Sequence, residues 1–285
     1  MIPASSLRGC RLLFASALLA AVPAFAAPAT TAPAQIQVPP AIDAAVKAST
    51  RDAANVKRDG FRHPAQSLAF FNVAADKTVI EITPGGGWYS EILAPLLRDK
   101  GHYIAAVVDP MAVAEGRGRD YQQRSRDSLE KKFAGAPAQF DKTTVVAYDP
   151  AKPVFGAAGS ADVVLTFRNV HNWRKAGQAQ GMFQGFFNVL KPGGVLGVVE
   201  HRAKADVADD DDSGYVGQQQ VIAMAEAAGF RLAASTELNA NPRDSKDHPN
   251  GVWTLPPTNQ HDKADAAKYQ AIGESDRMTL RFIKP

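Results

Sequence analysis

The chain has 285 residues, of which 45% are hydrophobic, so it is long enough to build one large core. Its 32 basic and 29 acidic residues give a formal net charge of +3, which is too small a basic excess to indicate nucleic-acid binding. The composition also excludes a disordered chain, a collagen and a membrane bundle.

The N-terminus is typical of a secretory signal peptide. Two arginines precede an apolar run at residues 12–22, and Ala24 and Ala26 are the small residues that a signal peptidase requires. We expect cleavage after Ala26, a periplasmic mature protein and no stable membrane insertion, because the run is shorter than the about 20 residues of a transmembrane helix. An uncleaved anchor is the alternative. Cys10, the single cysteine, lies in residues 1–26, so the mature chain would hold no disulfide.

The next segments are predicted from composition and apolar spacing. Residues 27–40 are rich in Pro, Ala and Thr and predict a flexible spacer. Residues 41–75 predict a helical N-terminal arm, with a new helix starting at Pro64. A charged group in this arm has two interpretations, a lid over a site or a solvated helix face: Arg58, Asp59, Arg62 and His63.

Strands and helices alternate through residues 76–285, which we interpret as one Rossmann-like domain. Apolar runs predict strands at 78–82, 102–110, 143–150, 161–170 and 195–201, and amphipathic runs predict helices at 90–97, 121–133, 182–190 and 218–230. Continuously apolar strands separated by helices predict an α/β fold, with a mostly parallel seven-stranded sheet covered by helices on both faces.

The C-terminal part has a different pattern. Residues 231–238 and 277–285 read as strands without a full helix between them, which predicts an antiparallel pair at the edge of the sheet. The last run alternates between apolar and polar residues, as a half-exposed strand does. Residues 239–265 are polar, contain four prolines and predict a long loop.

A glycine-rich turn follows the first predicted strand in the stretch EITPGGGWYS. Glu81 ends the strand, and glycines 85–87 let the backbone approach a ligand closely. A dinucleotide site needs G-x-G-x-x-G, but Ser90 stands at the third glycine position, and Trp88 and Tyr89 fill the helix start. The pattern therefore disfavours a nicotinamide enzyme and favours a nucleoside without phosphates, such as S-adenosylmethionine.

This stretch resembles the first motif of the class I S-adenosylmethionine-dependent methyltransferases, which is roughly acid-x-Gly-x-Gly-x-Gly. Glu81, Gly85 and Gly87 match it, whereas Thr83 replaces the first glycine and Pro84 stiffens the turn. The resemblance continues to the C-terminus through KPGG before the fifth strand and the antiparallel ending. RDGFRHP and the terminal FIKP are similar to an exported bacterial group of predicted methyltransferases.

The resemblance implies S-adenosylmethionine as the cofactor. Asp109 ends the second strand, where the family contacts the ribose, and Asp149 ends the third, where it contacts the adenine. In FRNVHNW, His171 stands where a general base would lie and Asn169 where the substrate would be contacted. A plain turn or loop-orienting role is the alternative for each of them. The predicted cofactor residues are Glu81, Thr83, Pro84, Gly85, Gly87, Asp109 and Asp149, and His201 is a weaker catalytic candidate.

We therefore expect methyl transfer to an unidentified small-molecule acceptor. A periplasmic binding protein for a nucleoside-like ligand is the alternative, and a nicotinamide-dependent oxidoreductase is less favoured. No metal is expected, because the six histidines lack ligand spacing and aspartates 209–212 lack the alternation of a calcium loop. The sequence leaves the oligomeric state open.

Overall fold

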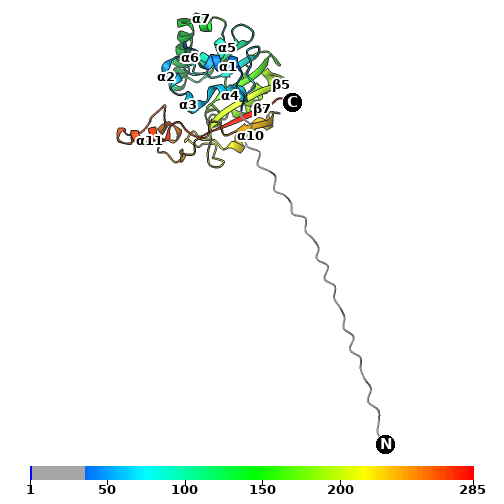
Figure 1. Cartoon of the computed structure of the whole chain (residues 1–285), viewed down its shortest axis with the longest axis vertical. Coiled ribbons are helices and arrows are strands. Elements are labelled where there is room, and N and C mark those ends of the chain that lie inside the picture. The colour runs from blue at the N-terminus through cyan, green and yellow to red at the C-terminus, as the bar shows by residue number, and fades with distance from the viewer. Residues whose placement is uncertain (2–35) are drawn as a thin grey trace. The chain divides into compact units, whose positions relative to one another are not determined.

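The seven predicted strands form one sheet in a computed structural model that describes Met1 and residues 36–285 (Figure 1). Their order is β3-β2-β1-β4-β5-β7-β6, and only β7 runs antiparallel to its neighbours. This arrangement confirms the predicted fold class. The predicted signal peptide lies, apart from Met1, outside the described residues. The strands are β1 Thr78–Ile82, β2 His102–Val108, β3 Thr144–Tyr148, β4 Ala161–Phe167, β5 Leu190–His201, β6 Arg231–Thr236 and β7 Arg277–Ile283.

The place of β7 corrects one expectation. β7 lies between β5 and β6, so both of its edges are paired, and Met278, Leu280 and Phe282 are fully buried in the cluster that α9 and α10 share. Thr279 on the opposite face is buried as well. The prediction of a half-exposed strand was therefore wrong, because β6 and not β7 forms the edge of the sheet. A second correction concerns KPGG, which belongs to β5 and does not precede it.

The helices cover both faces of the sheet. The predicted arm folds into α1 to α4, and α1, α4, α5, α6 and α7 share one hydrophobic cluster, whereas α8, α9 and α10 share the other (Figure 1). The helices are α1 Pro40–Val46, α2 Ala53–Val56, α3 Asp59–Arg62, α4 Pro64–Phe70, α5 Ser90–Leu97, α6 Arg117–Gly135, α7 Pro137–Phe140, α8 Val170–Lys175, α9 Ala179–Val189, α10 Gln218–Ala227 and α11 Ala266–Ile272.

Successive side chains of a strand belong alternately to the two hydrophobic clusters, one on each face of the sheet. On β1, Ile80 and Ile82 join the cluster under α9, whereas Val79 joins the cluster under α5. Successive side chains of a strand point to opposite faces, so a strand buried on both faces is apolar throughout. Within residues 36–285 no helix is long and apolar enough to cross a membrane.

The strand order places a crevice at the carboxyl ends of β1 and β4. The chain runs from β1 outward to β3, returns to the other side of β1 and continues outward from β4. Ligands of open α/β sheets bind where the strand order reverses in this way. The predicted long loop contains the 3-10 helices η2 Gly251–Thr254 and η3 Lys263–Asp265, and part of it lines the same crevice. A third 3-10 helix, η1 Pro110–Ala112, follows β2.

Candidate functional site

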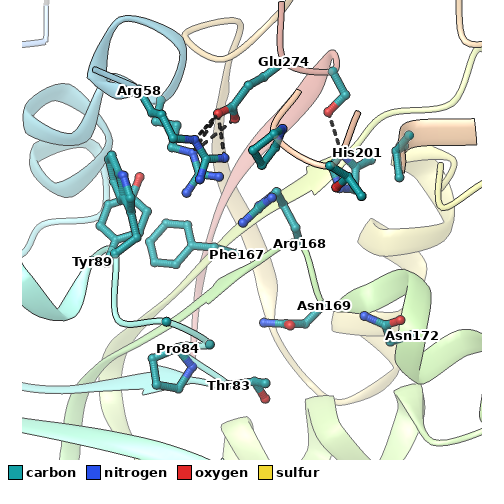
Figure 2. A pocket seen from close by; sticks show the side chains of 18 of the residues that line it. Arg58, Thr83, Pro84, Tyr89, Phe167, Arg168, Asn169, Asn172, His201 and Glu274 are labelled. Atoms are coloured by element: carbon teal, nitrogen blue, oxygen red, sulfur yellow. Dashed lines mark hydrogen bonds and ion pairs between the residues drawn. The ribbon is translucent and has the colours of Figure 1, made fainter. Parts of the chain in front are cut away.

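A cavity of about 370 Å³ occupies the crevice between β1 and β4 (Figure 2). This volume lies within the range of about 300–1,000 Å³ that is typical of small-molecule sites. Its wall combines the glycine turn after β1, the segment after β4, the end of β5, α3 and the long C-terminal loop. Its lining includes Arg58, Arg62, Glu81, Thr83, Pro84, Gly85, Gly86, Arg168, Asn169, His171, His201, Trp253 and Glu274.

The glycine turn presents bare backbone to this cavity. Thr83, Gly85 and Gly87 have φ of 51°, 58° and 74°, a conformation that costs a β-branched residue such as Thr83 more than a glycine. A Cβ added at Gly85 or Gly86 would meet no atom within 4 Å, whereas one at Gly87 would lie 3.1 Å from Leu129. Gly85 and Gly86 therefore face open space, and Gly87 serves the packing of the turn against α6.

Glu81 is held beneath the turn. Its Oε2 accepts hydrogen bonds from the Tyr103 hydroxyl at 2.5 Å and the Ser90 hydroxyl at 3.2 Å, and its side chain is buried. Burial raises the pKa of Glu81 to about 7, although the bonds from Tyr103 and Ser90 lower it. Burial in the cavity wall therefore disfavours the ionised form of the Glu81 carboxylate.

Glu81→Gln is expected to raise the free energy of unfolding near pH 8 by about 1–3 kcal/mol. The folded pKa of about 7 exceeds the reference value of 4.5. The contribution of Glu81 to the free energy of unfolding therefore falls as the pH rises from 4.5 through 7. A neutral amide removes that dependence and still accepts the bond from Tyr103. Urea unfolding near pH 5 and near pH 8 measures the change, and equal stabilities of the two proteins near pH 8 would contradict it.

Asn169 joins the ends of β1 and β4. Its Nδ2 donates to the Ile82 carbonyl at 3.0 Å and to the Thr166 hydroxyl at 3.2 Å. Its Oδ1 has no hydrogen-bond donor among the described residues, and the side chain lines the cavity. Asn169 can thus position the crevice and still offer one acceptor to a ligand.

His171 is oriented by a buried carboxylate. The His171 Nδ1 lies 3.0 Å from Oε1 of Glu200, which also accepts the His201 amide at 2.8 Å, while Oε2 accepts the Val170 amide at 2.6 Å. An ionised carboxylate only accepts, so we assign the proton to Nδ1, which leaves Nε2 as an acceptor. Trp253 packs against the imidazole, with ring centroids 6.0 Å apart. The pair has the geometry of a general base with its orienting group.

His201 is a second imidazole at the cavity. Its Nδ1 lies 2.5 Å from the Ser275 hydroxyl, and burial, together with the charges of His171 and Arg168, lowers its pKa well below 6.5. Among residues 36–285, His171, Glu200 and His201 form a group whose potential metal-ligand atoms lie within 4.8 Å of one another. The oxygens of Glu200 are already bonded to N–H groups, so the arrangement is suited to holding and moving a proton.

Arg58, Arg62 and Arg168 line the same cavity, as does the carboxylate of Glu274 (Figure 2). Arg277 does not line the cavity but contacts the same carboxylate. Glu274 accepts from Nε of Arg58 at 2.7 Å, Nε of Arg62 at 3.1 Å and Nη1 of Arg277 at 3.0 Å. Burial raises the pKa of Glu274, but the charges of Arg62, Arg277 and Arg58 outweigh burial and lower it to about 2. Arg168, with φ of 62°, makes no side-chain hydrogen bond or ion pair with any residue that the structure describes.

The predicted cofactor residues separate into two groups. Glu81, Thr83, Pro84 and Gly85 line the cavity, as do Asn169, His171 and His201. Gly87, Asp109 and Asp149 do not line it. The carboxylates of Asp109 and Asp149 each accept a backbone amide two residues ahead, from Met111 at 3.0 Å and from Ala151 at 2.8 Å. Asp109 and Asp149 therefore act as turn caps in this structure, and their contact with a cofactor stays a prediction.

Several site residues had no signal of their own in the sequence. Arg168 lies inside FRNVHNW, Glu200 lies in the fifth predicted strand, Trp253 lies in the predicted long loop and Glu274 follows that loop, and no pattern distinguishes any of them. Of the two interpretations of the charged arm, Arg58 and Arg62 line the cavity and are not on a solvated face. The sequence around Arg58, Asp59 and Arg62 does not indicate whether the arginine side chains face a cavity or the solvent.

Solved structures share this fold. An SAM-dependent methyltransferase from Aquifex aeolicus has a TM-score of 0.53 at 14% identity, with 80% of this chain and 93% of that chain covered. The [4+2]-cyclase SpnF has a TM-score of 0.53 at 16% identity, over 84% and 85% of the two chains. An S-adenosylmethionine-dependent methyltransferase from Mesorhizobium loti has a TM-score of 0.50 at 10% identity, over 79% and 99%. No protein-family model and no curated protein matches the chain. At these identities the likeness shows the Rossmann-like methyltransferase fold.

Proposed function

We propose that the chain binds S-adenosylmethionine at the glycine turn and transfers its methyl group to a small-molecule acceptor. The observation that carries the proposal is one cavity with two walls, the open backbone of Gly85 and Gly86 on one and the His171–Glu200 pair on the other. The fold likeness adds support from two methyltransferases, although the cyclase shows that the fold alone does not define the reaction.

The start of α5 supports a donor without phosphates. Trp88 and Tyr89 precede the helix and are buried, with Trp88 Nε1 donating to the Asn55 carbonyl at 3.0 Å. Tyr89 stacks on Phe167 with ring centroids 3.7 Å apart. These rings cover the helix start that a pyrophosphate would need in a dinucleotide site. A nicotinamide cofactor is therefore the poorer fit.

The residues around the cavity have separate roles in this proposal. S-adenosylmethionine, when bound, supplies a methyl group on a positively charged sulfur that an in-line nucleophile can displace. Nε2 of His171 accepts the proton of the nucleophile, and Glu200 holds the imidazole in that tautomer and stabilises its charged form. Trp253 and Asn169 bound the space in which the nucleophile approaches, which excludes water and orients the acceptor. The leader-like N-terminus supports a periplasmic location for this reaction.

Gly86→Val is expected to weaken the binding of S-adenosylhomocysteine by at least about tenfold and to leave the fold intact. Gly86 has no positive φ, and its added side chain would extend into open space where the ligand is proposed to lie. Calorimetric titration of the protein from Ala27 onward, with S-adenosylmethionine and with S-adenosylhomocysteine, measures this effect. The wild type is expected to bind both in the micromolar range.

Gly135→Val is the matched control for this substitution. Gly135 also has ordinary φ and no atom within 4 Å of an added Cβ, but it lies at the end of α6 and not at the cavity. It should bind like the wild type. A folded wild-type protein that binds neither nucleoside would refute the proposed function.

A further inference from the structure

Positive charge exceeds negative charge at one end of the cavity. Arg58, Arg62 and Arg277 share the single carboxylate of Glu274, and the guanidinium of Arg168 adds a fourth positive charge without a counter-ion of its own. Glu200 is the other carboxylate whose charge acts on Arg168, but it is already bonded to His171 and to backbone amides. The fold thus brings together four guanidinium groups, of which those of Arg62 and Arg277 are buried and those of Arg58 and Arg168 are partly exposed, beside fewer carboxylates than would neutralise them.

Some donors of this group are also unused. The Arg62 side chain is only 5% exposed, and its Nη2 is buried without a hydrogen-bond partner, as is Nε of Arg277. Arg62 stacks on Trp88, 4.8 Å from the ring centroid, so it is held in place and does not extend into solvent. Buried polar groups are nearly always bonded, and a guanidinium is matched best by a carboxylate or a phosphate. The missing partner is therefore an anion.

We propose that the methyl acceptor carries a carboxylate or phosphate group and that Arg168 and Arg62 bind it. This assignment rests on the proposed function, because it names the ligand as the acceptor. In Figure 2, Pro84 of the glycine turn lies at one end of the cavity and Glu274 with its arginines at the other, with Arg168 between them. The anion then lies away from the turn that holds the donor. Arg168, which binds it, is three residues before His171, and both residues line the cavity.

Titration with inorganic phosphate and with malonate tests the anion site directly. The wild type is expected to bind at least one of them in the millimolar range or tighter, and Arg168→Gln is expected to weaken that binding at least about tenfold, since it removes a charged hydrogen-bond donor. Arg62→Gln should act in the same direction. Arg281→Gln is the matched control, because Arg281 donates to the Phe70 carbonyl and to Asn72 outside the cavity, and it should not change the affinity.

S-adenosylmethionine, the proposed donor, also carries a carboxylate that the arginines could bind. A second titration distinguishes this carboxylate from an anionic group on the acceptor. S-adenosylhomocysteine keeps the amino-acid end, whereas 5′-methylthioadenosine lacks it. We expect Arg168→Gln to bind both like the wild type. If Arg168→Gln weakens S-adenosylhomocysteine tenfold and spares 5′-methylthioadenosine, the arginines hold the donor and the acceptor assignment is wrong.

Two further results separate the failure of this inference from the failure of the proposed function. If phosphate and malonate bind the wild type and Arg168→Gln equally, or do not bind the wild type, the anion site is refuted even though S-adenosylhomocysteine binds. If neither nucleoside binds but malonate or phosphate binding depends on Arg168, the proposed function fails, and the site is an anion site without a methyl acceptor. Unfolding curves of each variant confirm that the compared proteins are folded.

Discussion

His171→Ala is expected to lower the turnover number of methyl transfer by about 10²–10⁴-fold, the usual contribution of a general base. Nε2 of His171 is the acceptor that the Glu200 contact leaves free, and alanine provides none. The KM for S-adenosylmethionine should stay unchanged, because His171 is not part of the glycine turn. Transfer of a labelled methyl group to a panel of small carboxylates and phosphates measures both constants.

Glu200→Gln distinguishes catalysis from loop orientation. Glutamine has a single acceptor oxygen, which can keep the bond from Nδ1 while its NH₂ group faces the Val170 amide, and it no longer stabilises a charged imidazole. Turnover should fall while the KM for the donor is unchanged, and an unfolding curve shows whether the loss of the Val170 contact also destabilises the loop. His102→Ala is the control, because His102 is an exposed histidine of β2 that bonds only the Thr144 hydroxyl. Full activity of His171→Ala, with loss of activity in His201→Ala, would transfer the role of the base to His201.

Glu274→Gln is expected to lower the free energy of unfolding at neutral pH by about 3–5 kcal/mol, the range for breaking a buried ion pair from one side. Glu274 is 4% exposed and is the shared counter-ion of Arg58, Arg62 and Arg277. Burial lowers the pKa of Arg62 well below 12.5, so the guanidinium is itself costly to bury, and the carboxylate offsets that cost. Without it, several like charges would repel one another in a site of low polarity.

The same substitution has a defined pH dependence. The folded pKa of about 2 lies below the reference value of 4.5, so the stabilisation by Glu274 is complete above pH 4.5 and is lost as the pH falls toward 2. Urea unfolding should show that the gap between wild type and Glu274→Gln narrows across this window. Glu237→Gln is the control: Glu237 pairs with Arg202 but its side chain is 68% exposed, and its loss should cost less than about 1 kcal/mol. Equal effects of the two substitutions would contradict the prediction.

Local patterns in the sequence predicted the fold and one wall of the site. The strand TVIEI and the helix SEILAPLL have the bounds of β1 and α5, because alternation and helical spacing record which side chains of a segment are buried. Glycines 85–87 indicated the turn at the cavity for the same reason, since a positive φ and an unobstructed backbone are properties of the local chain. His171 and Asn169 were predicted from the resemblance of FRNVHNW to the fourth-strand motif of the methyltransferases, and both line the cavity.

The tertiary structure alone decided the other wall. Arg58 and Glu274 are separated by more than two hundred positions, and no periodicity relates them; they meet because β7 inserts between β5 and β6. The same strand order places β7 inside the sheet, where residues on both of its faces are buried, and the alternation of its residues does not reveal this. Asp109 and Asp149 follow β2 and β3 as predicted, but each carboxylate caps a turn. The backbone amide two residues ahead competes with a ligand for the carboxylate. By itself, the sequence determined the burial pattern and backbone conformation of segments such as β1, the glycine turn and α5, which depend on near neighbours. The charges that face one another across the cavity depend on the order in which the strands pair, and only the folded chain establishes that order.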